Sequence, residues 1–370
     1  MRKTQVVINK KYLIENLNFI KSRSKDAKHI AIVKANAYGH GAVEISNILS
    51  QEGIDAFGVA YTEEGAILRK AGLNEPIIIL VQQSEEDIPE IVEYNLQPAV
   101  STVPFLKKLN ETAEEQNKVI DVHLFIDTGM SRDGITCDEV VDFVAAAKDF
   151  HNIRFEGICT HFSAASLDPI ITAYQLANFN KAIDRLKAAG TTFNLIHAAS
   201  SAGLINYPET HFNAVRFGIT IFGYPPDEQI DYKFKVKPVL TLKSNISLIR
   251  RIKKGDSVSY SRHFIADKDT NIATVPIGYG DGYFRSLTGK ANCIIHDKFY
   301  PIVGNICMDE LMVDIGDDKL QIGDEVILIG KSKSHTITAS DLAKSIGTIS
   351  YEITTLIAPR VPRIYVSGND

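Results

Sequence analysis

Tryptophan is absent from the 370 residues, and the four cysteines form no CxxC pair and no metal-binding spacing. We therefore expect a cytosolic, reduced protein that holds no metal ion. The formal net charge of −5 lacks the basic excess that is typical of proteins that bind nucleic acid or anionic membranes. The longest hydrophobic runs, such as residues 76–81, are far too short to span a bilayer, and residues 1–10 contain too short an apolar stretch for a secretory signal.

Short β-branched runs alternate with longer amphipathic stretches over about the first 220 residues. Eight such β-then-α units are what a (β/α)8 barrel requires. An open doubly wound sheet is the rival fold, but it prefers a glycine-rich turn after its first strand, which residues 34–37 (KANA) do not supply. The predicted strands cover residues 29–33, 56–60, 77–81, 97–100, 121–126, 155–160, 194–197 and 215–219, with helical patterns between them, such as 42–49 and 174–189.

The pattern changes after Tyr224-Pro-Pro226, where many short alternating segments separated by Gly-Asp turns begin. One helix is predicted to start near Thr338 and to end at Gly347. We expect an α/β plus β architecture, with a (β/α)8 TIM barrel over residues 1–232 and a β-rich C-terminal domain over residues 233–370. The predicted strands of the second domain cover residues 239–249, 257–260, 272–277, 293–295, 306–313 and 325–329.

Lys34 directly follows the first predicted strand of the barrel. At the end of a buried strand a lysine does not reach solvent easily, and desolvation lowers its pKa and makes the amine nucleophilic. Such an amine is what a Schiff base to pyridoxal phosphate (PLP) requires. A surface lysine just past a strand is the alternative for an isolated Val-Lys pair, and the residues around Lys34 argue against it.

Other polar residues follow several of the later strands, at the C-terminal end of the barrel where the active sites of such enzymes lie. A lone histidine is more often structural, and a lone arginine can simply pair with a carboxylate. Their joint placement at one end of a barrel is harder to explain as structure alone. The serines and glycine that follow strands seven and eight suit a phosphate site. The residues concerned are Tyr38, Arg132, His161, Ser200, Ser201, Arg216, Gly218 and Ile219.

With these residues the chain resembles the alanine racemases, which are fold-type III PLP enzymes, over nearly its whole length. The resemblance implies that Lys34 forms the Schiff base, that Arg132 binds the phenolic oxygen of PLP and the substrate, and that His161 lies against the ring. Arg216 is implied to face the pyridine nitrogen, and Tyr38, Ser201, Gly218, Ile219 and Tyr351 to hold the phosphate. The matching motifs are 33–41 (VKANAYGHG), 127–132 (DTGMSR), 160–162 (THF), 215–218 (VRFG), 277–282 (IGYGDG), 304–309 (GNICMD) and 350–352 (SYE).

The same resemblance implies a head-to-tail homodimer, in which Tyr260 reaches the active site of the partner subunit as the second catalytic base. Tyr279, Met308 and Asp309 are implied to line the entrance for a small amino-acid substrate. The implied reaction interconverts L- and D-alanine and supplies D-alanine for peptidoglycan.

Two acid–base groups on opposite faces of the α-carbon are the simplest way to racemise an amino acid. Lys34 serves one face, and Tyr260 serves the other if its pKa falls well below the reference of about 10. Arg216 does not easily give up its proton, so the pyridine nitrogen stays unprotonated. A weaker electron sink favours rapid reprotonation over transamination, and arginine at this position argues for racemisation.

Phe125 is a departure from the family pattern, because many members carry at that position a carbamylated lysine that orients the arginine. Phenylalanine is not carbamylated, and our hypothesis is that Asp133 or a bound anion orients Arg132 instead. Residues 130–134 (MSRDG) also resemble the motif of broad-specificity racemases.

Alternative functions are a racemase for serine, lysine or a broad range, a fold-type III decarboxylase, and a non-catalytic PLP-binding protein. Tyr279 and Tyr351 are large and favour a small substrate side chain. The decarboxylase fits poorly with a tyrosine base and Arg216, and single-barrel PLP carriers lack a second domain.

Overall fold

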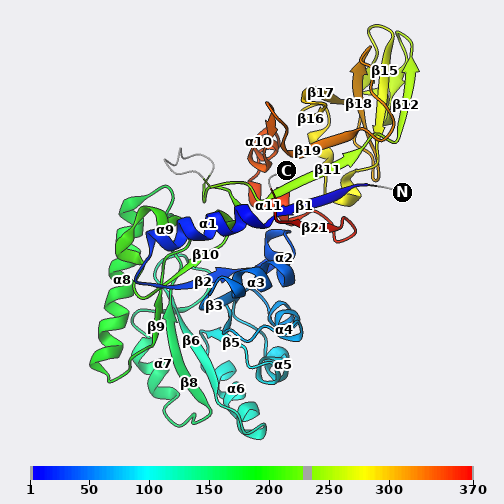
Figure 1. Ribbon diagram of the computed structural model, residues 1–370. Helices are drawn as coiled ribbons and strands as arrows, with labels where there is room; N and C mark the ends of the chain where they lie inside the picture. The colour runs from blue at the N-terminus through cyan, green and yellow to red at the C-terminus, as the bar shows by residue number, and fades with distance from the viewer. Residues whose placement is uncertain (1–2, 228–235, 369–370) are drawn as a thin grey trace. The chain divides into compact units, whose positions relative to one another are not determined.

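The computed structural model describes residues 3–227 and 236–368, which form two compact units (Figure 1). The barrel unit comprises Asn16–Ile221 and Pro225–Lys235, and the β-rich unit comprises Met1–Glu15, Phe222–Tyr224 and Val236–Asp370. The domain boundary expected at residue 232 lies outside the described residues.

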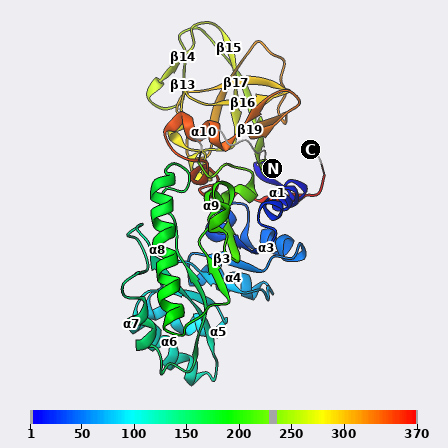
Figure 2. The ribbon, with the colours of Figure 1, turned by 90° about the vertical axis from the view of Figure 1, so that its left-hand side faces the viewer.

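The barrel unit contains a closed barrel of eight parallel strands surrounded by helices (Figures 1 and 2). It closes because the last strand pairs with the first, with Arg216 opposite Ile30, so the predicted (β/α)8 barrel is confirmed. These strands are largely buried on both faces, which is why they appear in the sequence as continuous apolar runs. In barrel order they are β2 (Lys28–Ile32), β3 (Ala56–Val59), β4 (Ile77–Ile79), β5 (Gln97–Val100), β6 (Ile120–Asp127), β8 (Ile153–Cys159), β9 (Leu195–His197) and β10 (Ala214–Phe217).

The predicted helices over residues 42–49 and 174–189 are present as α3 and α8. Helix α8 is capped by Asp168, whose carboxylate accepts hydrogen bonds from the amides of Ile170 and Ile171. The short strand β7 (Ile135–Thr136) pairs with β6 outside the barrel. The helices up to residue 222 are α1 (Lys10–Arg23), α2 (Lys34–Tyr38), α3 (Ala42–Gln51), α4 (Thr62–Lys70), η1 (Glu85–Asp87), α5 (Ile88–Glu93), α6 (Val103–Glu115), α7 (Val140–Ala146), α8 (Pro169–Ala188), α9 (Ser201–Asn206), η2 (Pro208–Thr210) and η3 (Ile219–Phe222).

The β-rich unit is built on a ten-stranded sheet, and it includes the first strand of the chain. β1 (Gln5–Asn9) pairs antiparallel with β11 and parallel with β21, although its residues were expected within the barrel domain. The other strands are β11 (Leu240–Asn245), β12 (Leu248–Ile252), β13 (Ser257–Val258), β14 (Phe264–Ile265), β15 (Thr270–Val275), β16 (Asn292–Ile295), β17 (Lys298–Val303), β18 (Leu311–Gly316), β19 (Glu325–Lys331), β20 (Thr336–Ile337) and β21 (Arg363–Val366).

The segment expected as one strand over residues 239–249 is two strands, β11 and β12, which pair with different partners. The predicted helix is α10 (Ala339–Ile346), with Thr338 and Asp341 in a capping box and Gly347 in the left-handed conformation at its end. The remaining helices of this unit are η4 (Tyr260–Arg262), η5 (Tyr279–Asp281), η6 (Arg285–Leu287) and α11 (Ser350–Thr355). In the described part of the chain, no helix is long and apolar enough to cross a membrane.

Candidate active site

The barrel residues singled out in the sequence all lie at the C-terminal ends of the barrel strands, which we call the barrel mouth. Lys34 follows β2, Arg132 follows β6, His161 follows β8, and Arg216 lies within β10. Ser201 begins α9 after β9, and Gly218 and Ile219 follow β10. The barrel topology therefore brings together residues that are far apart in the chain.

Lys34 is followed by a left-handed turn of four residues that are not glycine. Ala35, Asn36, Ala37 and Tyr38 have φ angles of 50, 55, 52 and 53°, and each costs about 1–2 kcal/mol relative to the right-handed conformation. Two side chains compensate this strain. Glu64 accepts hydrogen bonds from the amides of Ala35 (2.5 Å) and Ala60 (2.7 Å), and the Asn36 side chain accepts one from the amide of Ala42 (2.8 Å).

Glu64 is a site residue that the sequence reasoning missed. Glu64 is the third residue of α4, a position where a glutamate in the sequence indicates a capping box. That pattern does not indicate a second role for Glu64 beside Lys34.

The pKa of the Lys34 amine is lowered, first by burial and then by the positive charge of Arg132, with a smaller contribution of the same sign from Arg216. Glu64 acts in the opposite direction. A lowered pKa increases the fraction of neutral, nucleophilic amine near pH 7.

Arg216 is almost completely buried in the barrel mouth. Its guanidinium donates hydrogen bonds to the carbonyl oxygens of His197 (2.7 Å), Thr160 (2.6 Å) and Ala198 (2.9 Å), and to the ring nitrogen Nδ1 of His197 (2.7 Å). Within residues 3–227 and 236–368 no carboxylate pairs with it. The alternative that Arg216 is simply one half of a structural ion pair is therefore not supported.

His161 lies beside Arg216, with 3.4 Å between its Nδ1 and the guanidinium. Burial, together with the positive charges of Arg216, Arg132 and Lys34, lowers the pKa of His161 to about 3. The imidazole is therefore neutral at physiological pH. Lys34, Arg132 and Arg216 together leave an excess of positive charge, which suits an anionic ligand.

The predicted phosphate residues of the barrel lie together. The amide of Gly218 donates a hydrogen bond to the Ser201 hydroxyl (3.1 Å). A Cβ atom at Gly218 would lie 2.4 Å from the hydroxyl of Tyr38, so only glycine leaves room for that hydroxyl. Ile219 is the next residue and is buried.

Phe125 is buried against Ala99 and Cys159. The position offers no polar group to Arg132, whose Nε instead donates a hydrogen bond to Asp133 Oδ2 at 3.2 Å. The Asp133 side chain is 17% exposed and that of Arg132 51%, so Asp133 does not point freely into solvent. This geometry supports the hypothesis that Asp133 orients Arg132.

The other predicted site residues belong to the β-rich unit. Tyr260 is 71% exposed, and the side chain of Asn305 donates a hydrogen bond to its carbonyl oxygen (2.8 Å). The amides of Tyr279 and Gly280 bond to the carbonyls of Cys307 and Met308, which places Tyr279 beside Met308.

Asp309 lies next to Met308 in the chain and pairs with Arg360 (2.8 Å). Tyr351 lies in α11 and is half-buried.

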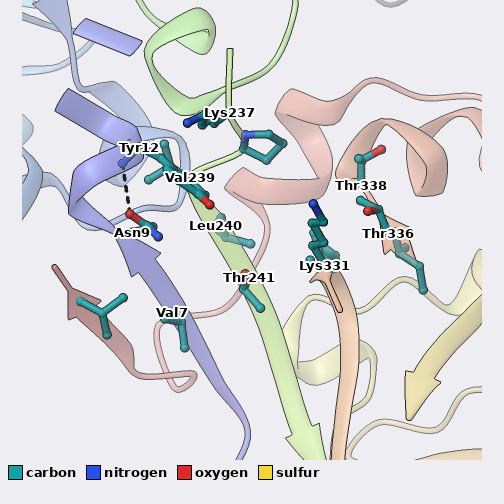
Figure 3. Close-up of a pocket in the computed structure, with 15 residues that line it drawn as sticks. Val7, Asn9, Tyr12, Lys237, Val239, Leu240, Thr241, Lys331, Thr336 and Thr338 are labelled. Carbon is teal, nitrogen blue, oxygen red and sulfur yellow. Dashed lines mark hydrogen bonds between the residues drawn. The ribbon is translucent and has the colours of Figure 1, made fainter. Parts of the chain in front are cut away.

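A cavity of about 270 Å³ also lies within the β-rich unit (Figure 3). It is lined by residues of β1, β11, β19 and β20 and by the lysines Lys237 and Lys331. None of the residues predicted for the active site lines it.

A (β/α)8 barrel that gathers a buried lysine and two arginines at its mouth, in a chain with a second, β-rich unit, is the architecture of a two-domain barrel enzyme, and these cationic groups could hold an anionic ligand. Two family models match: alanine racemase, N-terminal domain, over residues 8–226 and alanine racemase, C-terminal domain, over residues 239–365. The chain therefore belongs to the alanine racemase family, whose members are isomerases.

Known proteins resemble the chain over its whole length. An alanine racemase of Treponema denticola is 42% identical, with 99% of each chain covered. The structure of an alanine racemase of Clostridium difficile 630 is 35% identical with a TM-score of 0.95, covering 99% of this chain and 96% of that one. A histidine racemase of Leuconostoc mesenteroides is 28% identical with a TM-score of 0.92, covering 99% and 98%.

Proposed function

We propose that the protein is a PLP-dependent alanine racemase in which Lys34 and Tyr260 of the partner subunit act on opposite faces of the α-carbon. The observation that carries this proposal is the amine of Lys34 at the end of β2, with its pKa lowered by burial and by Arg132. Family membership supports the reaction, and alanine is the substrate in the names of relatives that are 40 and 42% identical to this chain.

The residues of the barrel mouth fit PLP. Arg132 and Arg216 supply positive charge for an anionic ligand, and Arg216 is buried without a carboxylate partner among the described residues. Tyr38 and Ser201 meet at Gly218, where two hydroxyls and backbone amides suit a phosphate. When bound, PLP supplies an electron sink that makes the α-proton of an amino acid acidic.

Lys34 holds or removes a proton at the α-carbon on one face, and Tyr260 of the partner subunit does so on the other. Arg216 would face the pyridine nitrogen and would keep its own proton, because guanidinium does not deprotonate in proteins. Neutral His161 would lie against the ring without adding charge. Arg132 would bind the phenolic oxygen and the substrate carboxylate, held by Asp133 in place of a lysine carbamate.

A head-to-tail homodimer in the cytoplasm is part of this proposal. Tyr260, Met308 and Tyr279 are 71, 54 and 42% exposed, although they are the residues proposed for the substrate side of the site. A second copy of the chain that covers them is what the two-base mechanism needs. The product D-alanine is proposed to enter peptidoglycan.

Deuterium exchange at Cα across a panel of L- and D-amino acids tests both the reaction and the substrate. We expect both enantiomers of alanine to exchange and interconvert fastest. Serine, lysine and histidine belong in the panel, because faster exchange of one of them would replace alanine as the substrate. Absence of exchange with every amino acid, while PLP stays bound, would favour the non-catalytic PLP-binding protein.

Two variants test the residue roles. Lys34→Ala should lose the visible absorption of the Schiff base, and an unchanged spectrum would refute the assignment. Tyr260→Phe should retain PLP but lose exchange with one enantiomer far more than with the other in a single turnover. Equal losses for both enantiomers would contradict a one-face role.

A further inference from the structure

Five polar side chains form a hydrogen-bonded series through the interior of the barrel, which we call the interior chain. His123 and His197 are completely buried. The series leads from the barrel mouth to Asp121, which pairs at 2.5 Å with Arg154. Its four links are Arg216 Nη1 to His197 Nδ1 (2.7 Å), His197 Nε2 to His123 Nδ1 (2.9 Å), His123 Nε2 to Gln97 Oε1 (3.1 Å) and Gln97 Nε2 to Asp121 Oδ2 (3.2 Å).

The chemistry of the two end residues, Arg216 and Asp121, determines which atom donates and which accepts in each of the four hydrogen bonds. Arg216 only donates, so Nδ1 of His197 must accept and its proton must lie on Nε2. His123 then accepts at Nδ1 and carries its own proton on Nε2, which donates to the Gln97 oxygen. At the other end, ionised Asp121 only accepts, so the Gln97 amide must donate to it and present its oxygen to His123. Both ends therefore require the same direction.

Both histidines must be neutral for this pattern, because an imidazolium has no acceptor nitrogen. Burial is the main cause that lowers the pKa of His123 to about 3, and burial with Arg216 lowers that of His197. The backbone also makes room for His123. A Cβ atom at Gly157 of β8 would lie 2.1 Å from His123 Nδ1, so an alanine there would displace the ring from its link to His197.

A buried guanidinium without a carboxylate partner among the described residues depends on neutral acceptors for its orientation. Three of the partners of Arg216 are backbone carbonyls, and two are imidazole nitrogens, His197 Nδ1 at 2.7 Å and His161 Nδ1 at 3.4 Å. A His197 ring in the opposite tautomer would present a proton to the guanidinium and repel it. The tautomer of His197 therefore decides whether Arg216 keeps the shorter of its two side-chain acceptors.

We propose that His197, His123 and Gln97 form a one-directional hydrogen-bond chain from Arg216 to Asp121 that holds the Arg216 guanidinium in one orientation at the barrel mouth. The three are positioning residues for Arg216. Their effect on catalysis rests on the proposed function, whereas the direction of the chain does not.

Ring nitrogen shifts from long-range ¹H–¹⁵N spectra of full-length, ¹⁵N-histidine-labelled protein test the direction, with and without added PLP. His123 and His197 should both be neutral Nε2–H tautomers at pH 7, with Nε2 protons that exchange slowly with solvent. An Nδ1–H tautomer or an imidazolium at either residue would overturn the proposal. This result does not depend on any racemase activity.

Gln97→Met and Gln97→Glu test the positioning role, with Gln83→Met as the matched control. Gln83 is a buried glutamine of the barrel unit, whereas Gln97 is half-buried, and Gln83 bonds to Thr62, Ala60 and Val81 outside the interior chain. Gln97→Met removes the acceptor for His123, so it should depopulate the Nε2–H tautomer of His123. Gln97→Glu keeps an acceptor and should keep that tautomer.

In the holoenzyme we expect Gln97→Met to lower kcat about tenfold, with KM changed less than threefold, and to shift the visible absorption of bound PLP. Gln97→Glu should recover most of kcat, and Gln83→Met should shift neither the absorption nor the tautomers. If Gln97→Met changes only the melting temperature, or if both methionine variants lose kcat equally, the positioning role is wrong. Cα exchange by the unmodified enzyme separately decides the proposed function.

Discussion

Replacing Gly218 by alanine tests whether close packing against Tyr38 builds the phosphate side of the site. The new Cβ would lie 2.4 Å from the Tyr38 hydroxyl and 2.9 Å from the ring carbon that carries it, whereas ordinary contacts begin at 3.4 Å. The hydroxyl must therefore retreat by about 1 Å, the difference between 3.4 and 2.4 Å. The φ angle of Gly218 lies outside the left-handed region, so alanine can adopt the same backbone conformation. The loss of stability therefore comes from the close contact with Tyr38.

Overpacking of this kind costs about 1–3 kcal/mol. We expect Gly218→Ala to lower the free energy of unfolding of the PLP-free protein by that amount in urea titrations. If Tyr38 also holds the phosphate, losing a hydrogen bond to a charged group costs about 1.5–3 kcal/mol, which raises the Kd for PLP roughly tenfold or more.

Tyr38→Phe provides the second arm of a double-mutant cycle, because it removes the atom nearest to the new methyl group. Gly218→Ala should destabilise the Tyr38→Phe background less than the unmodified protein, by more than about 0.5 kcal/mol. An equal cost in both backgrounds would refute the packing argument. An unchanged Kd in Gly218→Ala would refute the phosphate role.

Three further predictions concern stability, pH and Arg132. Asp168→Ala should lower the free energy of unfolding by about 0.5–2 kcal/mol in urea titrations, because it removes the cap of α8, whereas Asp184→Ala on the same helix should have little effect. His123 has a folded pKa of about 3 against 6.5 unfolded, so the unfolded chain binds the extra proton between these values and stability falls as pH drops below about 6.5. At pH 5 its share of that loss is about 2 kcal/mol, and a titration of unfolding free energy that stays flat from pH 8 to 5 would contradict it. Asp133→Ala should raise KM up to about fivefold, since a partly exposed pair contributes at most about 1 kcal/mol, and removing bicarbonate should leave activity unchanged because Phe125 forms no carbamate; a bicarbonate-dependent rate would contradict that assignment.

Much of the fold could be predicted because its signals are local. The barrel strands were placed within about two residues, since segments such as Ile77–Ile79 are buried on both faces and must be continuously apolar. Helix α10 was predicted from Thr338 and Gly347, whose capping geometry depends only on neighbouring residues. The residues of the barrel mouth followed from the rule that parallel strands present their C-terminal ends at one side.

Other features depend on partners that are distant in the chain. Pairing of β1 with β11 joins Val6 to Leu242, and nothing near Val6 indicates it. The left-handed turn after Lys34 has an unfavourable local conformation, which is offset in part by Glu64 of another helix, whose carboxylate accepts a hydrogen bond from the amide of Ala35.

The sequence by itself determined that a lysine ends the first barrel strand and that arginine and histidine end others, because those positions follow from periodicity along the chain. Only the tertiary structure decided what surrounds them. It places Arg216 against carbonyls and a histidine rather than a carboxylate, and it joins His197 of β9 to His123 of β6 and Gln97 of β5. Hydrogen-bond direction and desolvation depend on distances between segments far apart in sequence, and these distances exist only after the barrel has closed.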